Sequence, residues 1–294
     1  MQGRQFPRDP TAAPGESGPG PPQPPPKPEF KAEPGPLSVA SRRILGLRVD
    51  ATSYAETTEA IVGLAAAGAG GMVCHANVHM AMEAFDDAGL RRRLNAAERI
   101  TPDGVPLVWA LRWLGLREAG RVYGPTLTRR VCRRAAEAGI PVGFYGGRPE
   151  VLEALAVALA RRFPRLRIAF AYSPPFRPLT PEEDRRATEA IEASGARILF
   201  VGLGCPKQER WMASHRPALR CVLLGVGAAF DFLAGAKPQA PRWLQRAGLE
   251  WLFRLVIEPR RLWRRYLVQN PRFVWHFARQ IWSARRSASA DRCR

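Results

Sequence analysis

The sequence predicts an α/β protein built on a doubly wound, mainly parallel sheet. Two observations carry this prediction: strand and helix patterns alternate from residue 44 onward, and several apolar runs end in glycine turns. Alternating strands and helices are typical of repeated strand–helix–strand units, which set parallel strands side by side. With 294 residues and 46% hydrophobic content, the chain can bury the large core that such a sheet needs.

Seven runs are the expected strands, and helical patterns lie between several of them. The expected strands are residues 44–49, 72–74, 99–101, 142–145, 167–171, 198–203 and 221–226. The expected helices are residues 55–66, 105–114, 126–138, 149–163 and 181–193. The last helix has the clearest start, because Thr180 is a good N-cap and is followed by Pro181 and two acids.

Composition divides the chain into three parts. Residues 1–36 hold twelve of the 28 prolines and almost no large apolar side chains, so we expect a disordered leader. Residues 37–236 form the α/β domain. Residues 237–294 carry fourteen lysines and arginines against three acids, a net +11 of the total +19, and form a basic helical appendage. A charge this positive predicts an anionic partner: nucleic acid, phospholipid or a phosphorylated substrate.

The appendage has an unusual pattern in residues 249–282, where eight aromatic residues are interleaved with seven arginines. Aromatic and aliphatic residues with basic neighbours on short helices suit the lipid interface, where cations meet anionic headgroups. Ordinary packing of terminal helices on the core is the alternative, and part of the stripe is expected to do that. The five cysteines are scattered without CxxC spacing, which favours a reducing cytosol over a disulfide framework or a zinc site.

Lys207 is one of only four lysines among 45 lysines and arginines. It lies in Gly204-Cys205-Pro206-Lys207-Gln208-Glu209, directly after an apolar run that reads as a buried strand. A strand, a glycine turn and a helix start form the usual phosphate-binding place of α/β proteins, so Lys207 is a candidate anion ligand. The plainer interpretation is that this lysine occurs here by chance and binds no anion. Tyr145, Gly146 and Gly147 end another strand and are weaker nucleotide candidates, because glycine pairs are common in ordinary turns.

Three further segments contain candidate site residues. His75 and Asn77 follow a strand and suit hydrogen bonding to a sugar or phosphate, whereas Cys74 and His75 should point to opposite faces and not pair. Asp103 in Pro-Asp-Gly is either the cap of the next helix or an exposed carboxylate free to accept a substrate proton. Arg121, shortly before Gly124, could grip a diphosphate.

Asp231 stands alone in an apolar, small-residue segment and needs a partner or a ligand. No Asp-x-Asp motif is present, so arginines and Lys207 are expected to neutralise a leaving diphosphate in place of a metal. The full GxGxxG and Walker patterns are also absent, which leaves ATP hydrolysis without support.

Taken in order, these segments resemble the WecG/TagA/CpsF glycosyltransferase family (glycosyltransferase family 26) from about residue 44 to 273. The shared motifs are Ala-Asn-Val-His, Thr-Pro-Asp-Gly, Arg-Val-Tyr-Gly, Gly-Cys-Pro-Lys-Gln-Glu, Gly-Ala-Ala-Phe-Asp-Phe-Leu-Ala-Gly and Gly-Leu-Glu-Trp-Leu-Phe-Arg with a later Glu-Pro. One departure is His75, at a position where family members often carry threonine. The proline-rich leader also lies outside the family pattern.

The resemblance implies a Rossmann-like fold and a cytoplasmic enzyme held peripherally at the inner face of the membrane. It implies an inverting, metal-independent transfer of an N-acetylmannosamine-type sugar, or its uronate, from a UDP-sugar to a polyprenyl-diphosphate-linked acceptor. The resemblance implies no cofactor and is compatible with a homo-oligomer. Asp103 is the expected base. The expected donor-binding residues are His75, Asn77, Arg121, Gly124, Tyr145, Gly146, Gly147, Gly204, Lys207, Gln208, Glu209 and Asp231. Arg254, Arg261 and Arg264 are expected to hold the lipid diphosphate or headgroups.

Two other functions compete with this one. A nucleic-acid-binding protein would use the basic, aromatic C-terminal part but leaves the Pro-Asp-Gly and Pro-Lys-Gln-Glu segments without a role. A soluble transferase with a water-soluble acceptor would use the aromatic appendage only as core. Of the three, the membrane-associated transferase without nucleic-acid binding accounts for the most segments.

Overall fold

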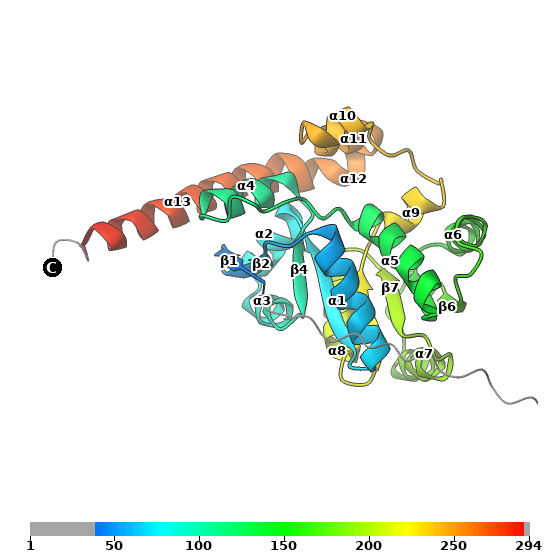
Figure 1. The fold of residues 1–294 in the computed structure, drawn as a ribbon. Coiled ribbons are helices and arrows are strands. Elements are labelled where there is room, and N and C mark those ends of the chain that lie inside the picture. Colours follow the sequence, from blue (N-terminus) through cyan, green and yellow to red (C-terminus); the bar gives the residue numbers. More distant parts are fainter. Residues whose placement is uncertain (1–38, 291–294) are drawn as a thin grey trace, which may run out of the picture. The chain divides into compact units, whose positions relative to one another are not determined.

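The computed structural model describes residues 39–290, so the leader expected at residues 1–36 lies outside the described part. Its centre is a parallel sheet (Figure 1), whose strands run in the order β4-β3-β8-β7-β5-β6, and this confirms the α/β, Rossmann-like fold. The strands are β3 (Gly71–Ala76), β4 (Arg99–Pro102), β5 (Val142–Gly146), β6 (Ile168–Tyr172), β7 (Ile198–Gly202) and β8 (Val222–Gly225). Each agrees with an expected strand to within two residues at either end.

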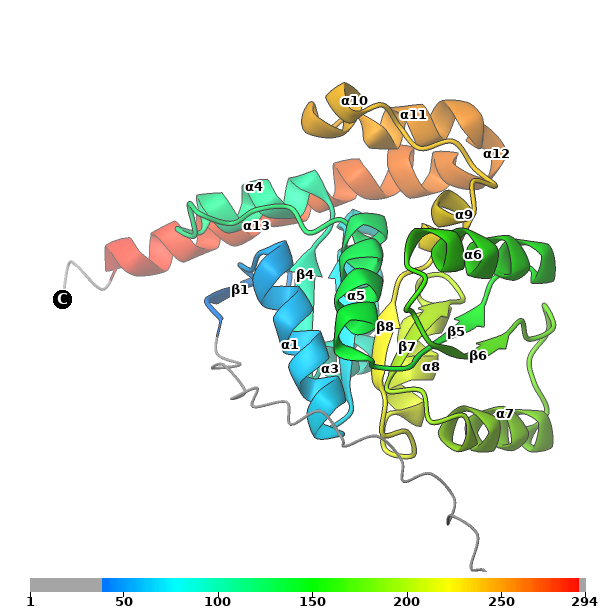
Figure 2. The same cartoon turned by 45° about the vertical axis from the view of Figure 1, so that its right-hand side comes forward.

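Helices cover both faces of the sheet (Figure 2). One face carries α1 (Tyr54–Ala67), α5 (Gly124–Ala138), α6 (Pro149–Arg162) and the short α9 (Ala229–Leu233). The other carries α2 (Val78–Asp86), α3 (Ala88–Asn95), α7 (Pro181–Ala193) and α8 (Lys207–His215). The start of α7 is as expected, because Thr180 and Glu183 form a reciprocal capping box.

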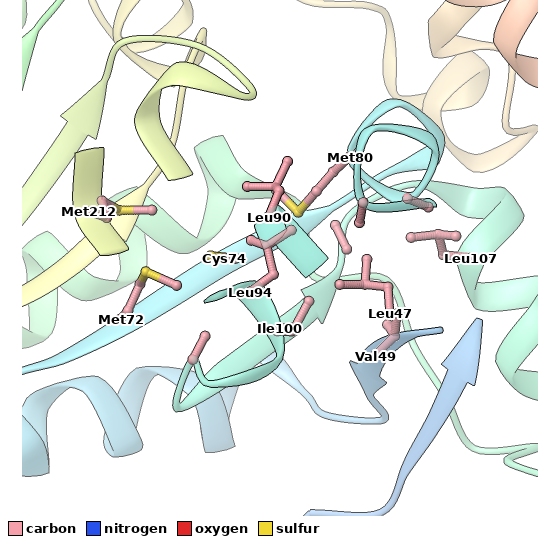
Figure 3. Packing of buried hydrophobic residues seen from close by; sticks show 14 of the residues in the cluster. Leu47, Val49, Met72, Cys74, Met80, Leu90, Leu94, Ile100, Leu107 and Met212 are labelled. Carbon is pink, nitrogen blue, oxygen red and sulfur yellow. The ribbon is translucent and has the colours of Figure 1, made fainter. Parts of the chain in front are cut away.

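The core under α2, α3 and α8 is tightly filled with sulfur and aliphatic side chains (Figure 3). Met72 and Cys74 of β3 meet Met212 of α8 and Leu90 and Leu94 of α3, and all five are at most 2% exposed. The first turn of α2 is anchored in the same cluster. This packing holds the carboxyl end of β3, where Asn77 begins α2, in a fixed place.

The expected strand at residues 44–49 is wrong. The chain instead forms a hairpin of β1 (Ser41–Ile44) and β2 (Leu47–Asp50), in which Ile44 pairs with Leu47 across a two-residue turn. Leu45 and Gly46 both have left-handed backbone, with φ of 52° and 84°. Such a turn matches the twist of a hairpin, but leucine is a rare residue there, so the apolar run gave no turn signal.

At the carboxyl edge of the sheet, several pairs of neighbouring strands send the chain to opposite faces. After β3 the chain enters α2 on one face, whereas after β8 it enters α9 on the other. The neighbours β5 and β7 diverge in the same way, toward α6 and α8. Such switch points open a crevice outside the strand ends, which is where open α/β sheets bind ligands.

The C-terminal region folds back over this edge. It consists of α10 (Arg242–Arg246), α11 (Glu250–Ile257), α12 (Pro259–Trp263), a π-helical turn η1 (Arg264–Val268) and α13 (Gln269–Ala290). The helix α4 (Val105–Trp113), which follows β4, lies alongside α13 in both views (Figures 1 and 2). Phe273 of α13 is buried against α2, and Gln280 of α13 accepts a 2.8 Å hydrogen bond from the Leu45 backbone amide.

Candidate active site

A cavity of about 90 Å³ lies at the carboxyl end of β3 and β4, under the C-terminal helices. The sheet and its loops supply Asp103 and Arg121, the starts of α2 and α4 with their caps supply six further residues, and the C-terminal region supplies the other seven. Its lining is Asn77, Val78, His79, Asp103, Gly104, Val105, Pro106, Arg121, Gly248, Glu250, Trp251, Arg254, Arg265, Tyr266 and Asn270. Polar side chains from segments far apart in sequence therefore converge on Asp103.

Asp103 is not a helix cap, which decides between the two interpretations of the Pro-Asp-Gly segment. The N-cap of α4 is Gly104, and no side chain caps that helix. The Asp103 backbone amide donates to the Ala76 carbonyl at 2.8 Å, which fixes the residue against the end of β3. Its carboxylate therefore caps no helix; about 20% of the side chain is exposed, and the buried Oδ1 has no hydrogen-bond partner.

The surroundings of Asp103 raise the pKa of its carboxyl from 3.8 to about 6. Burial is the largest cause, because it penalises the charged form. The nearby Glu250 raises the pKa further, whereas Arg121, Arg254 and the Gly124 backbone amide lower it. A carboxylate with this pKa is mostly ionised at neutral pH and still binds a proton far better than an ordinary aspartate, as a general base must.

Arg121 lies between two carboxylates. Its Nη2 is 2.7 Å from Glu250 Oε2 and 3.6 Å from Asp103 Oδ1, and its Nε donates to the Asp103 carbonyl. The guanidinium also lies over the Tyr123 ring, 4.4 Å from its centroid. The arginine expected to bind a diphosphate thus borders the Asp103 cavity, but two acids of the protein already contact it.

His75 and Asn77 occupy different surroundings. Asn77 caps α2 by accepting the Met80 amide, and it lines the cavity. His75 is 5% exposed beneath it, is absent from the lining, and its Nδ1 is 2.7 Å from Thr101 Oγ1. Burial lowers the pKa of His75 to about 4, so it is neutral at physiological pH. Gly124, at the start of α5, packs against the His75 ring.

Lys207 faces a second and larger cavity of about 660 Å³ at the divergence of β5 and β7. Tyr145, Gly147 and Gly202 line it from the strand ends, and residues 174–179 line it from the loop after β6. Tyr145 stacks on Trp211, with ring centroids 4.4 Å apart. Among the candidates from the sequence, Tyr145, Gly147 and Lys207 therefore gather here rather than around Asp103.

Close packing accounts for the glycines at this point. A Cβ on Gly146 would lie 2.8 Å from the Gly202 backbone, and a Cβ on Gly202 would lie 2.5 Å from the Phe230 ring. Both distances are shorter than real contacts allow. These glycines are required by the fold whether or not a ligand approaches them.

Gln208 and Glu209 of the Pro-Lys-Gln-Glu segment are buried and tie the loop to α8. Gln208 accepts the Gly204 amide at 3.2 Å and donates to Glu209 Oε1 at 2.7 Å. Burial raises the pKa of Glu209, whose Oε2 has no hydrogen-bond partner. Asp231, on α9, has its carboxylate 3.9 Å from Lys237 Nζ, which supplies the partner that its apolar segment required.

Of the three arginines expected in the appendage, only Arg254 lines the Asp103 cavity. Arg261 pairs with Glu258, and Arg264 lies over the Trp263 ring. The inward-facing neighbour is Arg265, which lines the cavity, is largely buried and has no hydrogen-bond partner at Nε. The sequence gave little sign of it, because a π-helical turn holds an extra residue and helical spacing does not tell which of two adjacent arginines faces inward.

Within residues 39–290, no three histidine, cysteine, aspartate or glutamate side chains gather closely enough to hold a metal ion. No helix within the same range is long and apolar enough to cross a membrane.

The site thus combines a carboxylate of raised pKa with inward-facing arginines at the ligand-binding edge of an α/β sheet. A comparison with protein-family models finds a match over residues 42–287 to the model described as Glycosyl transferase WecG/TagA/CpsF family. The match covers most of the 294 residues and includes both cavities and the C-terminal helices. The chain therefore belongs to the WecG/TagA/CpsF family of glycosyltransferases.

Proposed function

We propose that this glycosyltransferase is an inverting, metal-independent enzyme of cell-surface polysaccharide synthesis. It moves an N-acetylmannosamine-type sugar, or its uronate, from a UDP donor to a polyprenyl-diphosphate-linked acceptor. The observation that carries the proposal is Asp103: a carboxyl with a pKa of about 6, free of any capping role, in a cavity that three arginines line.

The proposed reaction is a single displacement. The acceptor hydroxyl oxygen attacks the anomeric carbon, the bond from that carbon to the UDP phosphate oxygen breaks, and the hydroxyl proton passes to Asp103. UDP leaves with the bonding electron pair. Lys207, Arg254 and Arg265 supply positive charge around the diphosphates, and cations fixed in place beforehand stabilise the developing negative charge.

The sizes of the two cavities suggest how the donor lies. The Asp103 cavity, at about 90 Å³, is too small for a nucleotide, whereas the cavity beside Lys207, at about 660 Å³, falls within the usual range for such ligands. The nucleotide is therefore proposed to lie near Tyr145, Gly147 and Lys207, with its sugar directed toward Asn77 and Asp103. His75 acts only through its neighbours, because it is buried.

The proposed function is tested by thermal stabilisation of the full-length protein across a panel of UDP-sugars and other nucleotides. A ligand that binds only the folded state raises the midpoint, by about 2.7 kcal/mol of stability at a hundredfold excess over its Kd. We expect UDP and one UDP-sugar to stabilise the protein and CDP or ADP not to. Tight, steeply salt-dependent binding of generic DNA or RNA with no response to UDP would contradict the proposal.

The proposed lipid-facing surface is formed by apolar side chains on the outside of the C-terminal helices. Trp263, Trp275 and Trp282 are 48%, 64% and 63% exposed, and Trp275 and Trp282 are seven residues apart on one side of α13. Arg264 and Arg286 lie over the rings of Trp263 and Trp282. Exposed aromatic rings with adjacent cations favour the headgroup region of an anionic bilayer.

Replacing Trp275 and Trp282 together by glutamine is expected to weaken binding to anionic phosphatidylglycerol vesicles at least tenfold. A tenfold loss requires only about 60 Å² of lost apolar contact, at about 25 cal/mol per Å². Point variants are preferable to deleting the appendage, because Leu262 and Phe273 are buried and their removal would open the core. Phe176→Gln, which removes an exposed ring outside the C-terminal helices, is the control. Unchanged vesicle binding by the double variant would exclude this surface.

A further inference from the structure

Glu250 stands in an unexpected place for an acidic residue in a basic appendage. It is the first residue of α11, yet only 11% of its side chain is exposed, and it faces the Asp103 cavity. Its Oε2 accepts a 2.7 Å hydrogen bond from Arg121 Nη2. The same nitrogen lies 3.6 Å from Asp103 Oδ1, which is too far for a hydrogen bond. One guanidinium thus stands between two carboxylates and is bound to the one from the appendage.

Which carboxylate Arg121 binds determines how well Asp103 can act as a base. A guanidinium bound directly to a carboxylate stabilises the charged form and occupies an oxygen. An aspartate held that way is a poor base, because the cation competes with the proton that the base should accept. Here Glu250 takes the short hydrogen bond, and Oδ1 of Asp103, although buried, has no hydrogen-bond partner. The Arg121 Nε contact with the Asp103 carbonyl keeps the guanidinium beside the base without covering it.

We propose that Glu250 is a positioning residue of the active site, which holds Arg121 away from the Asp103 carboxylate and so leaves that carboxylate free to take the proton of the acceptor hydroxyl. The inference rests on the proposed function for its catalytic meaning. Its structural part, the effect of Glu250 on the proton affinity of Asp103, is independent of any substrate.

Other charged or titratable groups also face Asp103. Arg121 and Arg254 lower the pKa of Asp103, and the cavity also contains Arg265 from η1. Burial lowers the pKa of His79 on α2 and raises that of Tyr123 before α5, so both are neutral near pH 7. Glu250 is the only acid among these groups. Without it, all remaining charges in the cavity lining favour the ionised form of Asp103.

The test follows the titration of Asp103 by ¹³C NMR in full-length protein labelled at the aspartate side-chain carboxyls. The Asp103 signal is the one missing from Asp103→Asn. In the wild type we expect a midpoint of about 6. In Glu250→Gln the midpoint should fall toward the ordinary aspartate value of about 4, because Arg121 is released to pair with Asp103. An unchanged or higher midpoint in a folded Glu250→Gln protein would overturn the proposal.

Three further variants make the result specific. Glu258→Gln removes another acid of the C-terminal helices, one that pairs with Lys237 and Arg261 outside the cavity, and should leave the midpoint unchanged. Glu250→Asp keeps the charge on a shorter side chain and should give a midpoint between those of the wild type and Glu250→Gln; it also serves if Glu250→Gln fails to fold.

In an Arg121→Gln background, Glu250→Gln should shift the midpoint less than in the wild type, because the two effects share one partner. Equal shifts in both backgrounds would exclude action through Arg121.

The rate of glycosyl transfer separates this inference from the proposed function. If both hold, the acidic limb of the pH–rate profile moves to lower pH in Glu250→Gln, as the NMR midpoint does, and the rate at neutral pH falls because the base is weaker. A shifted NMR midpoint with an unshifted pH–rate profile would support the role of Glu250 but contradict Asp103 as the base. A variant that is merely less stable would lose activity at every pH without moving either midpoint.

Discussion

Asp103→Asn is expected to lower turnover by about 10²–10⁴-fold, the usual contribution of a general base, while leaving UDP binding nearly unchanged. The amide has almost the same size as the carboxyl, and the backbone hydrogen bond to Ala76 does not depend on the side chain. In the wild type the rate should rise with pH through about 6, because the base acts only when it is ionised. Steady-state rates with the lipid-linked acceptor, together with UDP-induced thermal shifts, measure both effects.

Stability gives an internal control for the same variant. Because the pKa of Asp103 is raised on folding, the folded protein binds the proton more tightly, and ionising Asp103 costs stability as pH rises from about 4 to about 6. Asp103→Asn avoids this cost. It should be more stable than the wild type above pH 6, by at most about 3 kcal/mol, and similar below pH 4. Glu153→Gln, at an exposed position of α6 outside both cavities, serves as the activity control. Wild-type turnover by a stable Asp103→Asn protein would exclude Asp103 as the base.

Arg265→Gln is expected to weaken binding of a diphosphate by about 10- to 100-fold, because a hydrogen bond to a charged group contributes about 1.5–3 kcal/mol. Arg265 is largely buried, lines the Asp103 cavity and has an unpartnered Nε, so nothing in the protein replaces the missing ligand contact. Comparing KM for the lipid-linked acceptor with the affinity for UDP identifies which diphosphate it contacts. A loss in only one of the two assigns Arg265 to that substrate.

The adjacent arginine is the matched control. Arg264→Gln removes the same charge from the same turn, but Arg264 lies outside the cavity and over the Trp263 ring. It should change vesicle binding more than KM. Equal increases in KM for Arg264→Gln and Arg265→Gln would show that the appendage acts through its total charge. A larger increase for Arg264→Gln would show that Arg264, and not Arg265, contacts the diphosphate.

The sheet was predictable because its signals are local. Most of the strands are apolar runs that end at a glycine or a turn, and Asp103, Asn77 and Lys207 all follow predicted strands, so their common edge follows from parallel strands. The hairpin at Leu45 was missed because leucine rarely adopts positive φ.

The fine structure of the site was not predictable. The hydrogen bond between Arg121 and Glu250 joins residues 129 positions apart, and only the fold brings them together. Whether Asp103 caps α4 depends on whether the N-cap is Gly104 or the residue before it, a difference of one residue that lies within the ordinary uncertainty of helix boundaries. Arg265 faces inward through a π-helical turn that has no signature in the sequence. Lys207 and Asp103 face two separate cavities, one lined by the loop after β6 and the other by the C-terminal helices, and strand patterns do not predict either arrangement.

The docking of α13 sets a geometric limit on the substrate. This helix is on the order of 33 Å long, from 22 residues at 1.5 Å each, and it is fixed to the body of the enzyme by Phe273, by Gln280 on the β1–β2 turn and by Arg272 on Asp86. If its outer tryptophans lie in the headgroup layer as proposed, Asp103 stands at a constant height above the bilayer. The distance from the bilayer surface to Asp103 then determines which length of acceptor places its hydroxyl at the base. An acceptor lengthened by one sugar would carry its terminal hydroxyl beyond the base, so attachment to the membrane would limit the transfer to a single addition.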